Sequence, residues 1–275
     1  MELQAQWIDF GTAEARTPGY LAQPARVETP LPAVLVIQEI WGVDGHIQDL
    51  TERFATAGYV ALAPDLYARG GRRPHALGAE RVEAVKAFLD TLPPAAWMNP
   101  GERDRALAAL PAAQGDQVRE TLGTLFSPGR DLEAHARCLR DAVAFLREHP
   151  SVRGRRVGST GYCMGGALSA LLACTEPTLA AAVIYYGAAP APERLPGLAC
   201  PLLGFYGAED HRISDAVPAF AAALAAAGKS FRHHTYPDTP HAFFNDTRPA
   251  YRVEAARSAW SETLRFLAEH LTPGA

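Results

Sequence analysis

The chain has 275 residues, 48% of them hydrophobic, so it is long enough to bury a large core and too apolar for general disorder. Its formal net charge of −4 argues against a protein that coats nucleic acid or an anionic membrane. No apolar run reaches membrane-spanning length, and no secretory leader or disulfide framework is recognisable. We therefore expect a cytoplasmic protein with no membrane partner.

Short apolar runs and helical patterns alternate along most of the chain. In order, the expected strands span residues 3–10, 15–22, 33–37, 59–63, 156–160, 181–187, 201–207 and 230–236. The first two are expected to form an antiparallel pair. The expected helices span residues 47–58, 132–149, 164–174, 214–227 and 251–271. Strands and helices in turn indicate an α/β fold, with a mostly parallel central sheet and helices on both faces.

The stretch from about residue 70 to residue 130 breaks this alternation. It contains several glycine and proline pairs and short helical patterns, but no run typical of a strand. A separate domain is the weaker interpretation, because the helical patches are too short for a core of their own. We expect a single domain of residues 1–275 with an irregular helical insertion, or cap, at about 70–130.

The segment Gly161-Tyr162-Cys163-Met164-Gly165 has the spacing of the G-x-S-x-G nucleophile elbow, with cysteine in place of serine. The motif needs its glycines because the turn from strand to helix is tight and the nucleophile has a strained backbone. The dipole of the following helix would stabilise a thiolate. Cys163 is therefore the candidate nucleophile, with a buried structural cysteine as the alternative. That structural interpretation is the one expected for the other cysteines, Cys138, Cys174 and Cys200.

A nucleophile needs a base, and the base needs an acid that orients it. In α/β-hydrolases the acid follows the nucleophile in the chain, and the histidine follows the acid. Asp210 comes just after the expected strand 201–207, with its neighbour Glu209 as a weaker alternative, and His241 follows the next expected strand. Three other histidines are less suitable, because one adjoins the acid and two lie within a strand and point to opposite faces: His211, His233 and His234.

Five segments together resemble the dienelactone hydrolases, a cysteine-nucleophile branch of the α/β-hydrolase superfamily. They are Gln38-Glu39-Ile40-Trp41-Gly42, Ala63-Pro64-Asp65-Leu66-Tyr67, Gly161-Tyr162-Cys163-Met164-Gly165-Gly166, Tyr185-Tyr186-Gly187 and His241-Ala242-Phe243. The cysteine elbow together with the first segment is the specific part. The resemblance covers roughly residues 3–271 outside the 70–130 stretch, and it implies the α/β-hydrolase fold.

The resemblance also implies roles for particular residues. Cys163, His241 and Asp210 take the places of a catalytic triad. Glu39 is implied to enter the site beside the nucleophile, where a carboxylate disfavours the thiolate and keeps the resting thiol protonated until substrate displaces it. The backbone N–H groups of Ile40 and Met164 are the implied donors of the oxyanion hole.

The chain departs from the family at the positions that bind substrate. Well-known members hold the carboxylate of dienelactone with two arginines, one of them shortly after the catalytic histidine. Here that place reads Phe243-Phe244-Asn245, and the next arginine, Arg248, is displaced. The second arginine would fall within the 70–130 stretch, and Trp41 replaces the commoner phenylalanine. Candidate substrate contacts are Trp41, Arg69, Arg72 and Arg81.

We therefore expect a carboxylic ester hydrolase of the carboxymethylenebutenolidase type, which cleaves a small-molecule lactone or ester. No metal or organic cofactor is expected, because the chain has no HExxH, P-loop or strand-linked GxGxxG. The first alternative is a general carboxylesterase or thioesterase for neutral substrates, which the missing arginine after His241 favours. The second is a non-catalytic binding protein that kept the fold. A monomer is the default expectation, with no nucleic-acid partner.

Overall fold

The structure is a computed structural model that describes residues 1–12, 16–93, 96–97, 99–127 and 131–272. The chain divides into two compact units. Unit 1 comprises Met1–Leu66 and Asp131–Ala275, and unit 2 comprises Tyr67–Arg130. Unit 1 carries the sheet and is described first.

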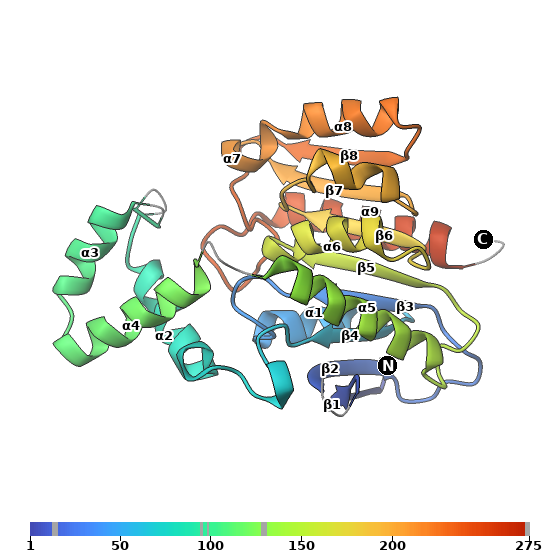
Figure 1. The fold of residues 1–275 in the computed structure, drawn as a ribbon, viewed down its shortest axis with the longest axis horizontal. Coiled ribbons are helices and arrows are strands. Elements are labelled where there is room, and N and C mark those ends of the chain that lie inside the picture. The colour runs from blue at the N-terminus through green and yellow to red at the C-terminus, as the bar shows by residue number, and fades with distance from the viewer. Residues whose placement is uncertain (13–15, 94–95, 98, 128–130, 273–275) are drawn as a thin grey trace. The chain divides into compact units, whose positions relative to one another are not determined.

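The described residues of unit 1 form an eight-stranded sheet of order β1-β2-β4-β3-β5-β6-β7-β8 (Figure 1). β1 and β2 pair antiparallel, β2 also runs antiparallel to β4, and the strands from β4 to β8 run parallel. The mostly parallel sheet predicted from the sequence is thus confirmed. The strands are β1 Leu3–Phe10, β2 Thr17–Pro24, β3 Ala33–Ile37, β4 Val60–Pro64, β5 Val157–Tyr162, β6 Ala181–Tyr185, β7 Leu202–Gly207 and β8 Phe231–Tyr236.

Helices cover both faces of this sheet (Figure 1). α1 and α9 share one face, where the rings of Phe54 and Trp260 lie 4.8 Å apart, and α5 and α6 lie on the other. The central strands are buried along their whole length, which explains their unbroken apolar sequences. The helical segments of unit 1 are α1 Gly45–Thr56, α5 Leu132–Glu148, α6 Met164–Thr175, the 3-10 turn η4 Pro192–Gly197, α7 His211–Ser214, α8 Val217–Ala226 and α9 Val253–Leu271.

The observed elements differ from the expected ones at a few ends. The second expected strand, 15–22, is observed as Thr17–Pro24, and residue 15 lies outside the described residues. The helix expected over 214–227 is observed as α8, Val217–Ala226, and Ser214 instead ends the separate short helix α7. Pro218 explains why a new helix begins here. Proline has no N–H, which is no loss in the first turn of α8, whereas it would break a helix that continued through this position.

Unit 2 is helical in its described part, with no strand among those residues. The helix α2 packs against α4, and Arg81 of α2 donates to Thr121 Oγ1 and to Gln117 O of α4, both at 3.1 Å. The helices are longer than the sequence indicated. That this unit is an insertion within a single domain stays a prediction. Its elements are η1 Arg69–Gly71, η2 His75–Leu77, α2 Ala79–Asp90, α3 Pro100–Ala108 and α4 Ala112–Leu125.

An aromatic cluster fills unit 1 beneath the carboxyl ends of the central strands. Tyr162 at the end of β5 stacks on Tyr185 of β6 with ring centroids 4.7 Å apart, and Phe244 lies 4.7 Å from Tyr185. The Tyr185 hydroxyl is within 2.6 Å of Thr263 Oγ1 on α9. These contacts fasten the segment after β8 onto the central strands.

None of the described helices is both long and apolar enough to cross a membrane.

Two glycines allow α6 to start directly against the ends of β3 and β5. A Cβ on Gly161 would lie 1.8 Å from the Gly165 oxygen, and a Cβ on Gly165 would lie 2.2 Å from the Ile37 oxygen. Both separations are far below van der Waals contact with backbone atoms. Any side chain at either position would therefore push the first turn of α6 away from the sheet.

The variant Gly165→Ala is expected to lower the free energy of unfolding by about 3 kcal/mol, because the new methyl group collides with backbone that cannot rotate away. Gly123→Ala is the matched control, since Gly123 also lies within a helix, α4, but has open space around it. The control should be neutral or stabilising by about 1 kcal/mol. Urea unfolding measures both, and equal effects would contradict the proposed close contact.

Candidate active site

Cys163 lies in the sharp turn between β5 and α6. Its φ of 55° and ψ of −112° are rarely adopted by a residue with a side chain. The turn is held by hydrogen bonds on both sides: Cys163 N–H donates to the Tyr185 oxygen at 3.0 Å, and Gly166 N–H donates to the Cys163 oxygen at 3.0 Å. The thiol-bearing residue is partly exposed at the N-terminus of α6. Strain of this kind is typical of functional sites.

Asp210 and His241 come from the loops that follow β7 and β8. The two loops are joined because Glu209 N–H donates to the Thr239 oxygen at 3.0 Å. His241 Nδ1 lies 2.5 Å from Asp210 Oδ2, and the Asp210 side chain is only 9% exposed. Glu209, the alternative acid, is an exposed residue. The structure thus brings Asp210 into contact with His241.

The electrostatics of His241 link these two loops to the elbow. Burial lowers the pKa of the imidazole, but the charge of Cys163 and hydrogen bonds to Asp210 and Cys163 outweigh it and raise the pKa to about 10. An imidazole held between a carboxylate and a thiolate readily takes up a proton. Cys163, His241 and Asp210 therefore form one continuous chain of contacts.

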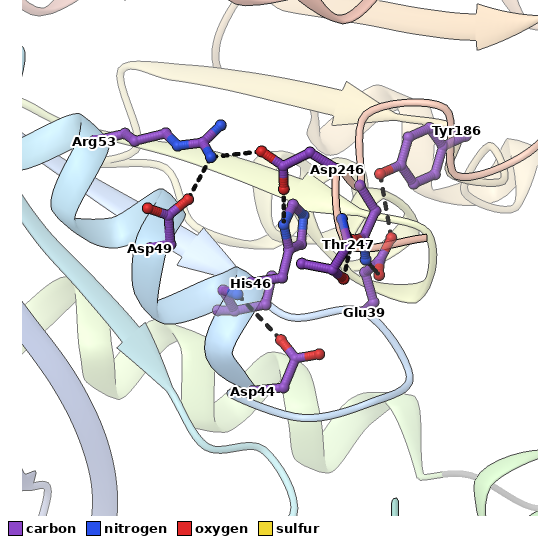
Figure 2. A network of polar contacts seen from close by, with 10 residues as sticks. Glu39, Asp44, His46, Asp49, Arg53, Tyr186, Asp246 and Thr247 are labelled. Atoms are coloured by element: carbon purple, nitrogen blue, oxygen red, sulfur yellow. Dashed lines mark hydrogen bonds and ion pairs between the residues drawn. The ribbon is translucent and has the colours of Figure 1, made fainter. Parts of the chain in front are cut away.

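Glu39 lies in the loop after β3 and is 2% exposed. Its two carboxylate oxygens accept hydrogen bonds from Tyr186 Oη at 3.2 Å and from Asn245 Nδ2 at 2.7 Å (Figure 2 shows the former). Burial, followed by the charges of Glu39 and its other neighbours, raises the pKa of Tyr186 well above its usual value, so the phenol stays a donor. The Tyr186 ring packs edge-on against the His241 ring, with centroids 5.0 Å apart. The Tyr186 side chain thus links Glu39 to His241, which in turn contacts Asp210 and Cys163.

The two expected oxyanion donors belong to segments that meet at this edge of the sheet. Ile40 follows Glu39, and Met164 is the first residue of α6. Trp41 is 6% exposed, and the guanidinium carbon of Arg248 lies 5.4 Å from the centre of its ring. Arg248, displaced in the sequence, is therefore packed beside the loop that carries Glu39.

The other candidate substrate contacts belong to unit 2. The side chain of Arg69 lies outside the described residues, and Arg72 is exposed. Arg81 uses its guanidinium inside unit 2, where it also pairs with Glu120 at 2.5 Å. A substrate contact for any of these arginines stays a prediction.

Sequence reasoning missed the partners of Glu39. Tyr186 belongs to a segment that carries the family resemblance, but the resemblance implies no role for it, and Asn245 draws attention in the sequence only because no arginine stands between it and His241. A sequence signal for Asn245 existed, since this polar residue directly follows the apolar run Ala242-Phe243-Phe244. Among the residues that the structure describes, no cluster of three or more His, Cys, Asp or Glu side chains is arranged to hold a metal ion.

The variant Asp210→Asn is expected to lower the pKa of His241 by about one to two units, because the imidazolium loses a charged hydrogen-bond partner. NMR titration of the His241 ring, assigned with His241→Gln, measures the shift. Glu209→Gln is the matched control, since it removes the adjacent exposed carboxylate and should leave the pKa within a few tenths of a unit. Equal shifts in both variants would contradict the Asp210 contact.

Comparison with known proteins assigns the chain to a family. The model of the dienelactone hydrolase family matches residues 17–271. A Saccharolobus solfataricus protein named "Putative carboxymethylenebutenolidase" is 33% identical over 261 residues, which cover 94% of this chain and 96% of that protein. The crystal structure described as "Putative Dienelactone Hydrolase from Klebsiella pneumoniae subsp. pneumoniae" has a TM-score of 0.66 and 29% identity, and the match covers 98% of this chain and 100% of that chain. Dienelactone hydrolase from Anabaena variabilis, at 18% identity and a TM-score of 0.63, with 98% of this chain and 100% of that chain covered, shares the fold. The chain has the α/β-hydrolase fold and belongs to the dienelactone hydrolase family of hydrolases.

Proposed function

We propose that the protein cleaves a small-molecule lactone or carboxylic ester by acyl transfer to Cys163, with His241 as the base and Asp210 as the acid that orients it. The observation that carries this proposal is the position of His241, whose Nδ1 lies 2.5 Å from Asp210 Oδ2. Burial lowers the pKa of His241, but the charge of Cys163 and hydrogen bonds to Asp210 and Cys163 outweigh this effect and raise the pKa to about 10. Such an arrangement of nucleophile, base and orienting acid supports nucleophilic catalysis.

The first half of the proposed reaction forms a thioester. His241 accepts the proton of the Cys163 thiol, and the thiolate attacks the carbonyl carbon of the substrate. The negative oxygen that develops accepts hydrogen bonds from the backbone N–H groups of Ile40 and Met164. The carbon–oxygen bond of the ester then breaks, and the imidazolium returns its proton to the leaving alkoxide.

In the second half, water attacks the thioester carbonyl, His241 takes a proton from that water, and Cys163 leaves as a thiol. A lactone keeps its alcohol tethered to the acyl group and allows a second route, in which the imidazolium keeps its proton, the tethered alkoxide takes the proton from water, and His241 protonates the departing Cys163 sulfur. Glu39 is proposed to oppose the thiolate in the resting enzyme and to move when substrate enters. This protects the thiol from oxidation between turnovers.

Cys163→Ala is expected to reduce ester hydrolysis by about 10⁴-fold or more, because no other group can form the thioester. Cys163→Ser should retain a small fraction of the activity, and iodoacetamide should inactivate the wild-type enzyme. Cys174→Ala is the matched control: burial raises the pKa of that thiol, and its loss should leave turnover unchanged. Full activity in Cys163→Ala would show that the nucleophile is assigned wrongly.

A second candidate function is a general carboxylesterase or thioesterase for neutral substrates. It is favoured by the stretch from His241 to Asn245, which has no arginine although well-known dienelactone hydrolases carry one shortly after the catalytic histidine. The amide of Asn245, at the end of this stretch, donates to Glu39 at 2.7 Å. A neutral amide gives an anionic substrate no charge-assisted hydrogen bond at this place.

If this second candidate is right, kcat/KM for short neutral aryl esters should exceed that for the dienelactone anion by about tenfold or more, which is the usual value of a charge-assisted contact. Steady-state kinetics on both substrates, at equal ionic strength, makes the comparison. A preference for the anion would assign the lactone instead and would require a cation in the site.

A further inference from the structure

The carboxylate of Glu39 is buried and depends on two neutral donors that belong to different parts of the chain. Tyr186 follows β6, whereas Asn245 lies in the loop after β8, and the hydrogen bond from Asn245, at 2.7 Å, is the shorter of the two. A buried carboxylate is costly unless its oxygens are hydrogen-bonded. The position of Glu39 therefore depends on what holds Asn245 in place.

The amide of Asn245 is oriented by Thr247. Asn245 Oδ1 accepts hydrogen bonds from the Thr247 N–H at 3.1 Å and from the Thr247 hydroxyl at 2.6 Å. A backbone N–H can only donate, so the oxygen of the amide must face Thr247 and the NH₂ group must face Glu39. A flipped amide would lose the hydrogen bond from the Thr247 N–H and the one to Glu39, because it would place donor against donor and acceptor against acceptor. The Asn245 side chain therefore acts as a donor, and not as an acceptor, toward Glu39.

The next residue, Asp246, ties this loop to α1 (Figure 2). Asp246 Oδ1 lies 3.3 Å from Nδ1 of the buried His46, and Asp246 Oδ2 lies 2.6 Å from Arg53, which also pairs with Asp49 at 2.5 Å. The contact with His46 and the pairing with Arg53 hold the pKa of Asp246 well below its usual range, against the smaller opposing effect of burial. Asp246 therefore stays charged and paired at neutral pH.

The helix α1 also fixes the other side of the Glu39 contact. It begins at Gly45, a few residues after Glu39, and Asp44 caps it by accepting from Ile47 N–H at 3.1 Å (Figure 2). The loop that carries Glu39 and the loop that carries Asn245 are thus attached to the same helix. This shared attachment fixes the position of the Asn245 amide relative to the Glu39 carboxylate.

We propose that Asn245 is a positioning residue that holds the Glu39 carboxylate in the site, and that Asp246 positions Asn245 by tying its loop to α1. The proposal rests on the proposed function, in which Glu39 opposes the Cys163 thiolate. Both of the described donors to Glu39 are neutral, so an entering substrate can displace the carboxylate without separating it from a fixed cation at these contacts. Asn245 in this way sets how firmly the resting thiol is restrained.

The test is the pH dependence of iodoacetamide alkylation at Cys163, followed by mass spectrometry so that the other cysteines do not interfere. The titratable groups near Glu39 are Tyr162 and Tyr186, with Cys163 and His241 beside Tyr186. Burial raises the pKa of both tyrosines out of the tested range of about pH 4 to 9. The pKa of His241, raised to about 10, also lies above that range, so a changed profile between the variants reports on Glu39 and the thiol.

Asn245→Leu, which keeps the branching and the number of non-hydrogen atoms of the side chain and removes the donor, should be alkylated at Cys163 about tenfold faster than wild type on the rising limb of the profile. The reason is that a carboxylate without its donor is protonated or displaced more readily. Either change removes the negative charge that opposes formation of the Cys163 thiolate. In the Glu39→Gln background the same substitution should change the rate less than twofold, within the usual error of additivity. Unchanged alkylation in Asn245→Leu, or equal acceleration in both backgrounds, would overturn the proposal.

Two milder variants keep the test decisive if Asn245→Leu does not fold. Thr247→Val removes the hydroxyl that orients the amide, and Asp246→Asn removes the ion pairs to α1, so both should shift alkylation in the same direction by a smaller factor. Their matched controls are Thr178→Val, whose hydroxyl bonds Glu176, and Glu269→Gln, which breaks an exposed ion pair with Arg232. Shifts as large in the controls as in these variants would refute the role of Asn245.

The assay separates this proposal from the proposed function. Alkylation measures the thiol directly and needs no turnover, so the Asn245 comparison is decided even if Cys163→Ala retains hydrolysis. Conversely, loss of activity in Cys163→Ala with no difference between wild type and Asn245→Leu would support the reaction and reject Asn245 as a positioning residue.

Discussion

The close contact between the start of α6 and the ends of β3 and β5 is the constraint on which the rest of the site depends. A Cβ at Gly161 or Gly165 would lie within 1.8 Å or 2.2 Å of backbone oxygens, so only glycine permits the contact. The turn that results gives Cys163 its φ of 55° and aims the first N–H groups of α6 at the carboxyl edge of the sheet. Because parallel strands end at the same edge, the loops after β3, β6, β7 and β8 can all reach this point.

The aromatic cluster converts that edge into a rigid platform. Tyr162 and Tyr185, at the ends of neighbouring strands, stack at 4.7 Å, and Phe244 of the loop after β8 packs on them at 5.6 Å and 4.7 Å. Phe244 lies between His241 and Asn245 in the chain, so its packing constrains the positions of both. Large apolar contacts thus supply the precision that the polar contacts need.

The site holds two carboxylates whose surroundings differ. Asp210 contacts the His241 imidazole at 2.5 Å, where the pairing favours the protonated ring. Glu39 accepts from the neutral Tyr186 and Asn245 instead. Residues of the same chemical type can take different roles when their partners differ, and here one carboxylate is proposed to orient a base and the other to restrain a nucleophile.

Local patterns in the sequence predicted the alternation of strands and helices, and these elements were confirmed to within a few residues. Glycine spacing marked the elbow, since a tight turn needs glycine whatever surrounds it. The same patterns were less informative where tertiary packing decides, as in the longer helices of unit 2 and the break between α7 and α8.

The sequence by itself determined the fold class, the family and the three candidate residues Cys163, Asp210 and His241, because these depend on periodicity and on short motifs. The tertiary structure alone decided that Asp210 rather than Glu209 contacts His241, and that Tyr186 and Asn245 hold Glu39. Those two partners lie 147 and 206 residues from Glu39 along the chain. No local pattern encodes a contact over such a distance, because it exists only once the sheet has brought the ends of its strands together.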